Sequence, residues 1–229
     1  TSGSTERAVP VPMSFLQICL LLAKGAGYTV LVTAACIATA LVTGLAIAIL
    51  RRQAGAALTR LLAIYVYVFR GVPVLVLLFI MFFGLPGIGI NVPPLVSMML
   101  SLGLISGAYL AEVFRGALEA IDPHEVIAAE AMGMTRMQAL LSIELPQMLR
   151  LAVPGMLNEF TTVLKYSPFA YTVGIPEIMK QAMALASVTL RGVEIYLAAG
   201  LLYFAIYQLI RLLVRSIERK FAIPGFAQN

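Results

Sequence analysis

Residues 120–146, AIDPHEVIAAEAMGMTRMQALLSIELP, decide how the rest of the chain is arranged. Apolar runs flank this stretch on both sides, yet its own charged residues are too dense for the interior of a bilayer. Asp122 and Pro123 are typical of a helix N-cap and first helical position, and Glu125 supplies the acid of a capping box. We therefore predict a short helix that runs to Met132 and is exposed between two membrane segments.

A second helix is predicted directly after the first. Gly133 suits the left-handed conformation that ends helices, and Thr135 with Gln138 forms another capping box. Pro146 marks the end of this helix or a kink in it. The stretch is thus predicted to be a helix–turn–helix that docks a partner, with an ordinary polar loop as the alternative. Its acidic residues and its place between apolar spans disfavour a DNA-binding helix–turn–helix.

Composition indicates an all-α integral membrane protein. Of 229 residues, 61% are hydrophobic and 12% are charged, about half the charged share of a soluble domain. The length fits one membrane domain. We expect a flexible N-terminal segment over 1–12, a transmembrane domain over 13–220 and a C-terminal tail over 221–229.

Five apolar segments are candidates for transmembrane helices, since about 20 residues suffice to cross the hydrocarbon layer. They cover residues 28–50, 61–85, 95–114, 149–164 and 195–214. The second is expected to break near Gly71 and Pro73 into an interfacial half and a span, and the fourth to kink near Pro154. A further short helix is expected over 178–186.

The third span carries Gly103 and Gly107, a spacing that permits another helix to approach closely. Basic residues gather in the loops after the first and third spans and at the C-terminus, whereas the loop after the second span has none. This pattern predicts an N-terminus outside the cell and a C-terminus in the cytoplasm.

Residues for catalysis or metal binding are scarce. No GxxxxGK[ST] phosphate-binding loop occurs, and His124 is the one histidine, so neither a catalytic triad nor a histidine metal cluster is available. Cys19 and Cys36 lie in apolar surroundings and are interpreted as small buried hydrophobes. We expect no enzyme activity, no metal and no cofactor in this chain.

Polar side chains inside the apolar spans are the candidates for a substrate path. They are Glu112, Asn158, Glu159, Thr162 and Lys165. Such groups are costly in lipid and usually face a cavity or a partner. Glu112 has an alternative role, pairing with Arg115 on its own helix, and the stripe from Asn158 to Lys165 has another, joining helices by hydrogen bonds. Arg70 is interpreted as a headgroup anchor rather than a substrate contact.

The stretch at 120–146 resembles the cytoplasmic coupling loop of ABC importer permeases. The residues that fall at the spacing of that loop are Ala128, Ala129, Gly133, Ile143, Leu145 and Pro146. The glutamate of the family pattern falls on Ile127, and the nearest acids are Glu125 and Glu130. Stretches at 70–73, 107–116, 145–147, 158–159 and 218–220 are similar to the polar amino-acid uptake branch of the family.

The resemblance implies a type I ABC importer permease that moves polar amino acids across the cytoplasmic membrane. Its partners would be ATP-binding cassette subunits that hold ATP and Mg, a second permease of the same or a sister chain, and an extracytoplasmic binding protein. The residues implied to contact the ATPase are Glu125, Ala128, Ala129, Glu130, Gly133 and Met134. A permease for methionine or another small solute is the alternative within the class. A channel, a secondary transporter or a structural scaffold would act without a P-loop partner.

Overall fold

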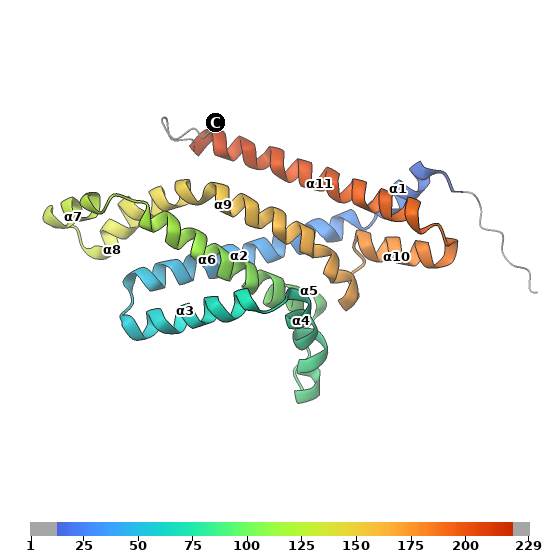
Figure 1. Ribbon diagram of the computed structural model, residues 1–229, viewed down its shortest axis with the longest axis horizontal. Helices are drawn as coiled ribbons and strands as arrows, with labels where there is room; N and C mark the ends of the chain where they lie inside the picture. Colours follow the sequence, from blue (N-terminus) through green and yellow to red (C-terminus); the bar gives the residue numbers. More distant parts are fainter. Residues whose placement is uncertain (1–12, 222–229) are drawn as a thin grey trace, which may run out of the picture.

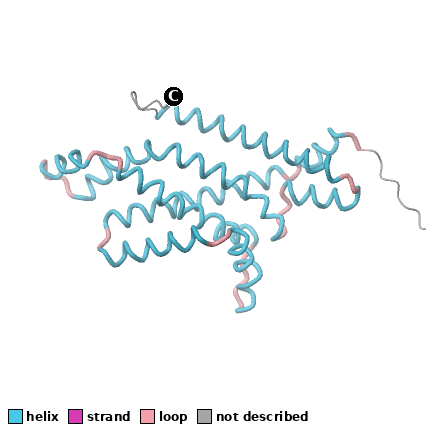
Figure 2. The backbone as a smooth tube through the Cα atoms, viewed as in Figure 1, coloured by secondary structure: helices cyan, strands magenta, loops and turns pink. Residues whose placement is uncertain are grey.

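The computed structural model describes residues 13–221, with side chains up to residue 213, and in this part of the chain every regular element is a helix (Figures 1 and 2). The long α-helices are α2 (Ala26–Gln53), α3 (Ala56–Gly71), α6 (Leu104–Glu119), α9 (Leu145–Tyr166) and α11 (Gly192–Phe221). The shorter ones are α1 (Phe15–Ala23), α4 (Val74–Phe79), α5 (Pro94–Met98), α7 (Pro123–Ala131), α8 (Arg136–Ala139) and α10 (Ile178–Thr189). The predicted all-helical fold is confirmed, whereas segment 1–12 and nearly all of the tail 221–229 lie outside the described residues.

Short π-helical and 3₁₀-helical turns connect several of these helices. The π-helical turns are η1 (Ile80–Gly84), η3 (Met99–Gly103) and η4 (Leu140–Glu144). The 3₁₀-helical turns are η2 (Leu85–Ile88) and η5 (Ser167–Val173). Because η3 leads directly into α6 and η4 into α9, each of these two long helices begins as the continuation of a wider turn.

The centre of the molecule is the contact between α2 and α6, which run side by side along its length (Figure 1). A Cβ atom on Gly107 would lie 2.0 Å from Thr43 Oγ1, and one on Gly103 would lie 2.8 Å from Thr39 Cβ. Glycine is therefore required at both positions for the helices to come this close. The close approach predicted for these two glycines is confirmed.

The second apolar segment breaks where predicted, since α3 and the α4–η2 stretch meet at an angle of 100° around Val72 and Pro73. The interfacial position expected for its first half stays a prediction. Helix α3 runs along α2 and α6 in Figure 1, because Val66 and Tyr65 pack with Ala108 and Ala111 of α6. The second half, with α5 and η3, forms the hairpin that projects from the bundle in Figure 1.

Three described helices are long and apolar enough to cross a membrane, and the bent pair is a fourth if it counts as one span. The three are Ala26–Gln53, Pro94–Glu119 and Gly192–Leu213. Helix α9 is long enough but carries Arg150, Asn158, Glu159 and Lys165, which lower its mean hydropathy. The expected count of five spans is therefore not confirmed by length and composition.

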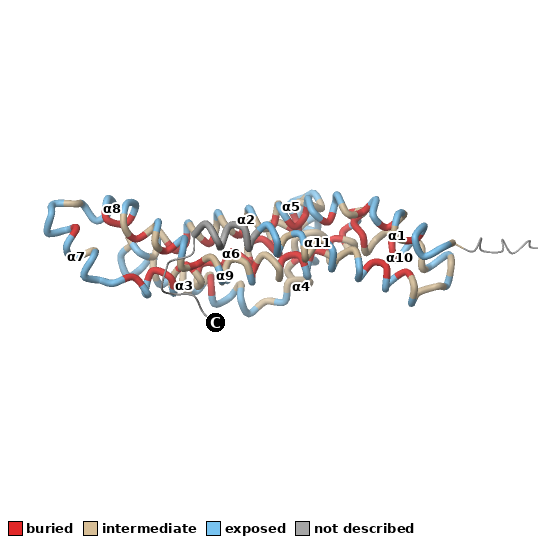
Figure 3. The backbone as a smooth tube through the Cα atoms, turned by 90° about the horizontal axis from the view of Figure 1, so that it is seen from above, coloured by how far each residue is buried: buried red, intermediate tan, exposed pale blue. Residues whose placement is uncertain are grey.

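The outer elements α1, α10 and α11 pack on one another at the end opposite α7 (Figure 1). Their shared core contains Ile18, Leu22, Ile178 and Ile195. The short helix expected over 178–186 is confirmed as α10, which extends three residues further. Figure 3 shows buried residues along the middle of the bundle, whereas α7 at its end is mostly exposed.

Candidate functional site: a coupling segment and a polar cavity

Residues 120–146, which we call the coupling segment, begin with a helix that starts where the sequence predicts. Asp122 Oδ1 accepts a hydrogen bond from the His124 N–H at 2.9 Å, and Pro123 is the first residue of α7. The capping-box role expected for Glu125 is wrong. Its carboxylate instead accepts a hydrogen bond from Gln147 Nε2 at 2.5 Å, which ties α7 to the start of α9.

The turn between α7 and α8 is a Schellman motif. Gly133 has φ of 89°, its N–H donates to the Glu130 carbonyl, and the Met134 N–H donates to the Ala129 carbonyl. Thr135 and Gln138 then form the predicted capping box, with hydrogen bonds in both directions. The helix–turn–helix and the left-handed glycine are therefore confirmed.

One buried carboxylate joins the coupling segment to the membrane body. Glu144 is 3% exposed, and its Oε1 accepts a hydrogen bond at 3.0 Å from Nε of Arg52, at the end of α2. The Arg52 carbonyl also accepts a hydrogen bond from Arg136 Nη2 at 3.0 Å. The end or kink expected at Pro146 takes the form of the π-helical turn η4, after which α9 continues.

The surface of the coupling segment combines exposed apolar side chains with carboxylates. Of the residues implied for ATPase contact, Ala129 is buried, Met134 is half-buried, and Glu125, Ala128, Glu130 and Gly133 are exposed. The sequence reasoning did not select Ile127, Met132 and Met137, which are 58%, 87% and 48% exposed. Large apolar side chains this exposed outside the spans are typical of a protein-docking surface.

A polar cavity of about 470 Å³ lies between the start of α4, α6 and α9. Its lining residues with polar side chains are Arg70, Ser106, Tyr109, Asn158, Glu159, Thr162 and Tyr166. Glu159 is 8% exposed, and its carboxyl interacts with the Ser106 hydroxyl of α6. Asn158 and Thr162, predicted to share one face of α9 with Lys165, line the cavity together with Glu159.

Arg70 is the member of the cavity to which the sequence reasoning gave another role. Its guanidinium carbon lies 4.9 Å from the centre of the Tyr109 ring, a cation–π contact between the end of α3 and α6. The signal available in the sequence was a lone arginine in an apolar segment just before a Gly-x-Pro break. That signal is equally typical of a headgroup anchor.

Two predicted path residues lie outside the polar cavity. Glu112 Oε1 accepts a hydrogen bond from Arg51 at 2.8 Å, and its Oε2 accepts one from Arg115 at 2.9 Å. The pairing with Arg115, which was the alternative reading of Glu112, is thus present. Lys165 does not line the polar cavity and instead lines another pocket, with Pro168 and Tyr203.

Comparisons with known proteins agree with this architecture. A family model described as a binding-protein-dependent transport system inner membrane component matches residues 40–223. The chain is 32% identical over 199 residues to the probable amino-acid ABC transporter permease protein YckA of Bacillus subtilis (strain 168), covering 87% of this chain and 88% of that protein. It is 31% identical over 170 residues to the histidine/lysine/arginine/ornithine transport system permease protein HisQ of Escherichia coli (strain K12), covering 69% and 75% of the two chains.

Solved structures of ABC transporters superpose on this fold. A crystal structure of an amino acid ABC transporter with histidines superposes with a TM-score of 0.81 at 29% identity, covering 92% of this chain and 100% of that chain. An inward-facing structure of the MetNI methionine ABC transporter superposes with a TM-score of 0.76 at 23% identity. The second likeness concerns the fold alone.

Proposed function

Because the chain belongs to the family of binding-protein-dependent transport system inner membrane components, we propose that it forms the pathway through which an ATP-driven importer moves polar amino acids. The observation that carries this proposal is the polar cavity, which holds a guanidinium, a carboxylate and an amide among apolar helices. Its volume of about 470 Å³ lies in the range of small-molecule sites, about 300–1,000 Å³.

The chemistry of the cavity suits a zwitterion. An amino acid presents an ammonium group, which needs acceptors, and a carboxylate, which needs donors. The Glu159 carboxylate receives the ammonium group, and the Arg70 guanidinium with the Asn158 amide binds the carboxylate. The Thr162 hydroxyl already donates to the Asn158 carbonyl at 3.0 Å, so it acts toward substrate as an acceptor.

The coupling segment carries the contact with the energy source. A separate ATP-binding cassette subunit, which binds ATP and Mg, docks on α7 and α8 through the exposed Ile127, Met132 and Met137 and the nearby Glu130. A second permease, the same or a sister chain, completes the pathway, and an extracytoplasmic binding protein delivers the amino acid. ATP binding then shifts the permease pair between inward-facing and outward-facing states.

Orientation follows from the charges around the coupling segment. Arg51, Arg52, Arg115 and Arg136 are joined by ion pairs and hydrogen bonds at the end of the bundle that carries α7 and α8. Arginines favour the cytoplasmic side of a membrane, so we propose a cytoplasmic coupling segment and C-terminus and an N-terminus outside.

This orientation is tested by placing single cysteines in a chain whose Cys19 and Cys36 are replaced by alanine. A cysteine at Gly87, in η2, is expected to react with an impermeant thiol reagent in intact cells, because a side chain there meets no neighbouring atom. A cysteine at Gln138, in α8, is expected to react only after the cells are opened. The reverse labelling would invert the proposed orientation.

The substrate path is tested with Glu159→Gln, which keeps the shape of the side chain and removes its charge. The complete transporter is reconstituted in vesicles, and ATP-driven uptake of cationic, neutral and acidic amino acids is compared with basal ATP hydrolysis. We expect uptake to fall about tenfold or more, or its preference among the three classes to change, since a charge-assisted hydrogen bond to the ammonium is lost. Basal hydrolysis is expected to persist.

Glu194→Gln is the matched control, because Glu194 pairs with Arg191 at the start of α11, away from the polar cavity. If the Glu159 variant assembles and transports every amino acid as before, Glu159 is not in the path. If it fails to assemble while the control assembles, Glu159 joins helices instead. Uptake without a P-loop subunit would point to a channel or a secondary transporter.

A further inference from the structure

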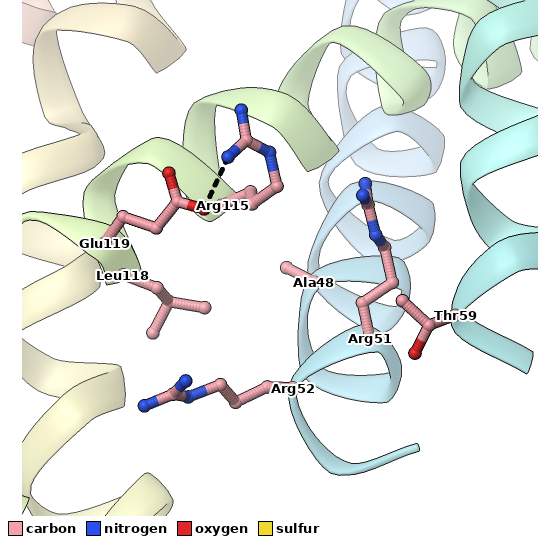
Figure 4. Close-up of a pocket in the computed structure, with 7 residues that line it drawn as sticks. All are labelled: Ala48, Arg51, Arg52, Thr59, Arg115, Leu118 and Glu119. Atoms are coloured by element: carbon pink, nitrogen blue, oxygen red, sulfur yellow. Dashed lines mark hydrogen bonds and ion pairs between the residues drawn. The ribbon is translucent and has the colours of Figure 1, made fainter. Parts of the chain in front are cut away.

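A second cavity, of about 220 Å³, lies at the end of the bundle that carries the coupling segment, where α2 ends, α3 begins and α6 ends. Its lining residues are Ala48, Arg51, Arg52, Thr59, Arg115, Leu118 and Glu119. Figure 4 shows Arg51 and Arg52 extending from α2 and Arg115 from α6, with the Arg52 guanidinium directed away from those of Arg51 and Arg115. We call this second cavity the arginine cavity.

Arginine is the most frequent charged residue on the wall of the arginine cavity. Three arginines line it with one acidic residue, Glu119, whose carboxylate pairs with Arg115 at 2.6 Å. The carboxylates that balance the other two arginines are Glu112 and Glu144, and neither lines the cavity. The three arginines and three carboxylates balance in charge, so the capacity of the cavity to bind an anion rests on N–H groups that the carboxylates leave unused.

Each arginine keeps N–H groups that its carboxylate partners do not occupy. Arg51 uses Nη1 for Glu112, and Arg115 uses Nε and Nη1 for Glu112 and Glu119. A guanidinium has five N–H donors, so several remain for another acceptor. Thr59 of α3 adds a hydroxyl that makes no hydrogen bond within the described part of the chain.

The arginine cavity lies at the depth where a span ends. Arg51 and Arg52 are in the last turn of α2, directly after its apolar run. Figure 1 shows α7 and α8 extending beyond the ends of α2 and α3, so a partner docked on them lies farther from the spans than the cavity does. A group that enters the cavity from the membrane surface is a lipid headgroup.

We propose that the arginine cavity binds a phosphate group, presented by an anionic phospholipid of the leaflet that faces the coupling segment. Arg51 and Arg115, whose guanidiniums both contact Glu112, donate to the phosphate oxygens through their unused N–H groups, and the Thr59 hydroxyl donates a further hydrogen bond. The bound phosphate bridges α2 and α6 beside the Arg52–Glu144 pair that holds the coupling segment. This site is separate from the polar cavity and from the path of the substrate.

Thr59 allows the test to be made without breaking any ion pair. Thr59→Glu places a negative charge in the arginine cavity, Thr59→Gln is its neutral match, and Thr59→Arg adds a positive charge. Each charge near such a headgroup changes lipid affinity about fivefold. We therefore expect phosphatidylglycerol to bind about fivefold more weakly to Thr59→Glu than to Thr59→Gln, and about fivefold more tightly to Thr59→Arg.

The measurement is native mass spectrometry and thermal unfolding of the complete detergent-purified transporter, titrated with phosphatidylglycerol, phosphatidylcholine or inorganic phosphate. Stabilisation by phosphatidylglycerol alone, in the order Arg, Gln, Glu at position 59, supports the proposal. Equal stabilisation by inorganic phosphate would overturn the lipid source in favour of free phosphate. An unchanged phosphatidylglycerol affinity across the three variants, or no binding to the complete transporter because an acidic ATPase side chain fills the cavity, would overturn the site.

Discussion

The α2–α6 contact and the coupling segment are held in place by different physical means. Between α2 and α6, Gly103 and Gly107 leave no room for a single added carbon atom. In the coupling segment, a Cβ atom on Gly133 would meet nothing within 4 Å, and order comes from caps, a Schellman turn and one ion pair to Arg52.

This difference predicts which substitutions impair folding and assembly of the bundle and which impair coupling to the ATPase subunit. Added volume between α2 and α6 has to separate two long helices that carry much of the core, so its effect spreads through the fold. A change in the coupling segment alters local hydrogen bonds on a surface and leaves the spans intact. The predictions below test this contrast.

Gly107→Val is expected to have the largest effect. Its Cβ atom would lie 2.0 Å from Thr43 Oγ1, which itself donates to the Thr39 carbonyl at 2.7 Å. We expect a loss of stability at or above the upper end of the about 1–3 kcal/mol seen for overpacked cores. Little folded transporter should then survive detergent extraction and size-exclusion chromatography.

Gly116→Val is the matched control for this variant, on the same helix. Gly116 is exposed, and a Cβ atom there meets nothing within 4 Å. This control is expected to be extracted at close to the wild-type yield, after allowance for the helix propensity of valine. Equal yields of both variants would mean that α2 and α6 are not held by close approach.

The coupling segment was predictable from sequence because its signals are local. Asp122, Gly133 and Thr135 act on backbone groups within a few residues, so their roles follow from spacing alone. The capping-box role predicted for Glu125 was wrong because its actual partner is distant in the sequence. A carboxylate that fits a capping box also fits an amide 22 residues away, and no local rule reveals Gln147 as its partner.

The polar cavity was predictable only along one helix. Asn158 and Thr162 share a face of α9 through helical periodicity, with Glu159 beside them, whereas Arg70 joins them from a different helix. The position of Arg70 depends on the angle of 100° between the two helices that meet near Pro73. The sequence predicts that the helix breaks there but not the direction in which the chain continues. The same lack of tertiary information hid the ion pair between Glu112 and Arg51, which lie on different helices.

The ion pair between Arg52 and Glu144 joins α2 to the coupling segment, and its loss is expected to have the next largest effect on stability. Arg52→Gln leaves a carboxylate that is 3% exposed without its partner, which costs about 1–3 kcal/mol. Glu144→Gln costs less, because the Arg52 side chain is 43% exposed and stays hydrated. In thermal unfolding of the purified transporter, the double variant should therefore resemble Glu144→Gln rather than the sum of the two. Additive effects would show that the pair does not hold the coupling segment.

Gly133→Val is expected to have the smallest effect on stability and a large one on coupling. Valine at φ of 89° is strained by about 1–2 kcal/mol, although nothing obstructs the side chain, so the Schellman turn opens while the spans stay folded. Gly133→Asn is the matched control, since asparagine tolerates positive φ.

The measurements for this pair are amino-acid uptake, ATP hydrolysis and retention of the ATPase subunit. We expect the valine variant to unfold thermally close to the wild type, yet to hydrolyse ATP without uptake or to lose the ATPase subunit. The asparagine variant is expected to keep all three. Because both substitutions remove the same glycine, a difference between them reports backbone conformation rather than lost flexibility. Coupled uptake by the valine variant would show that the ATPase does not depend on the left-handed turn between α7 and α8.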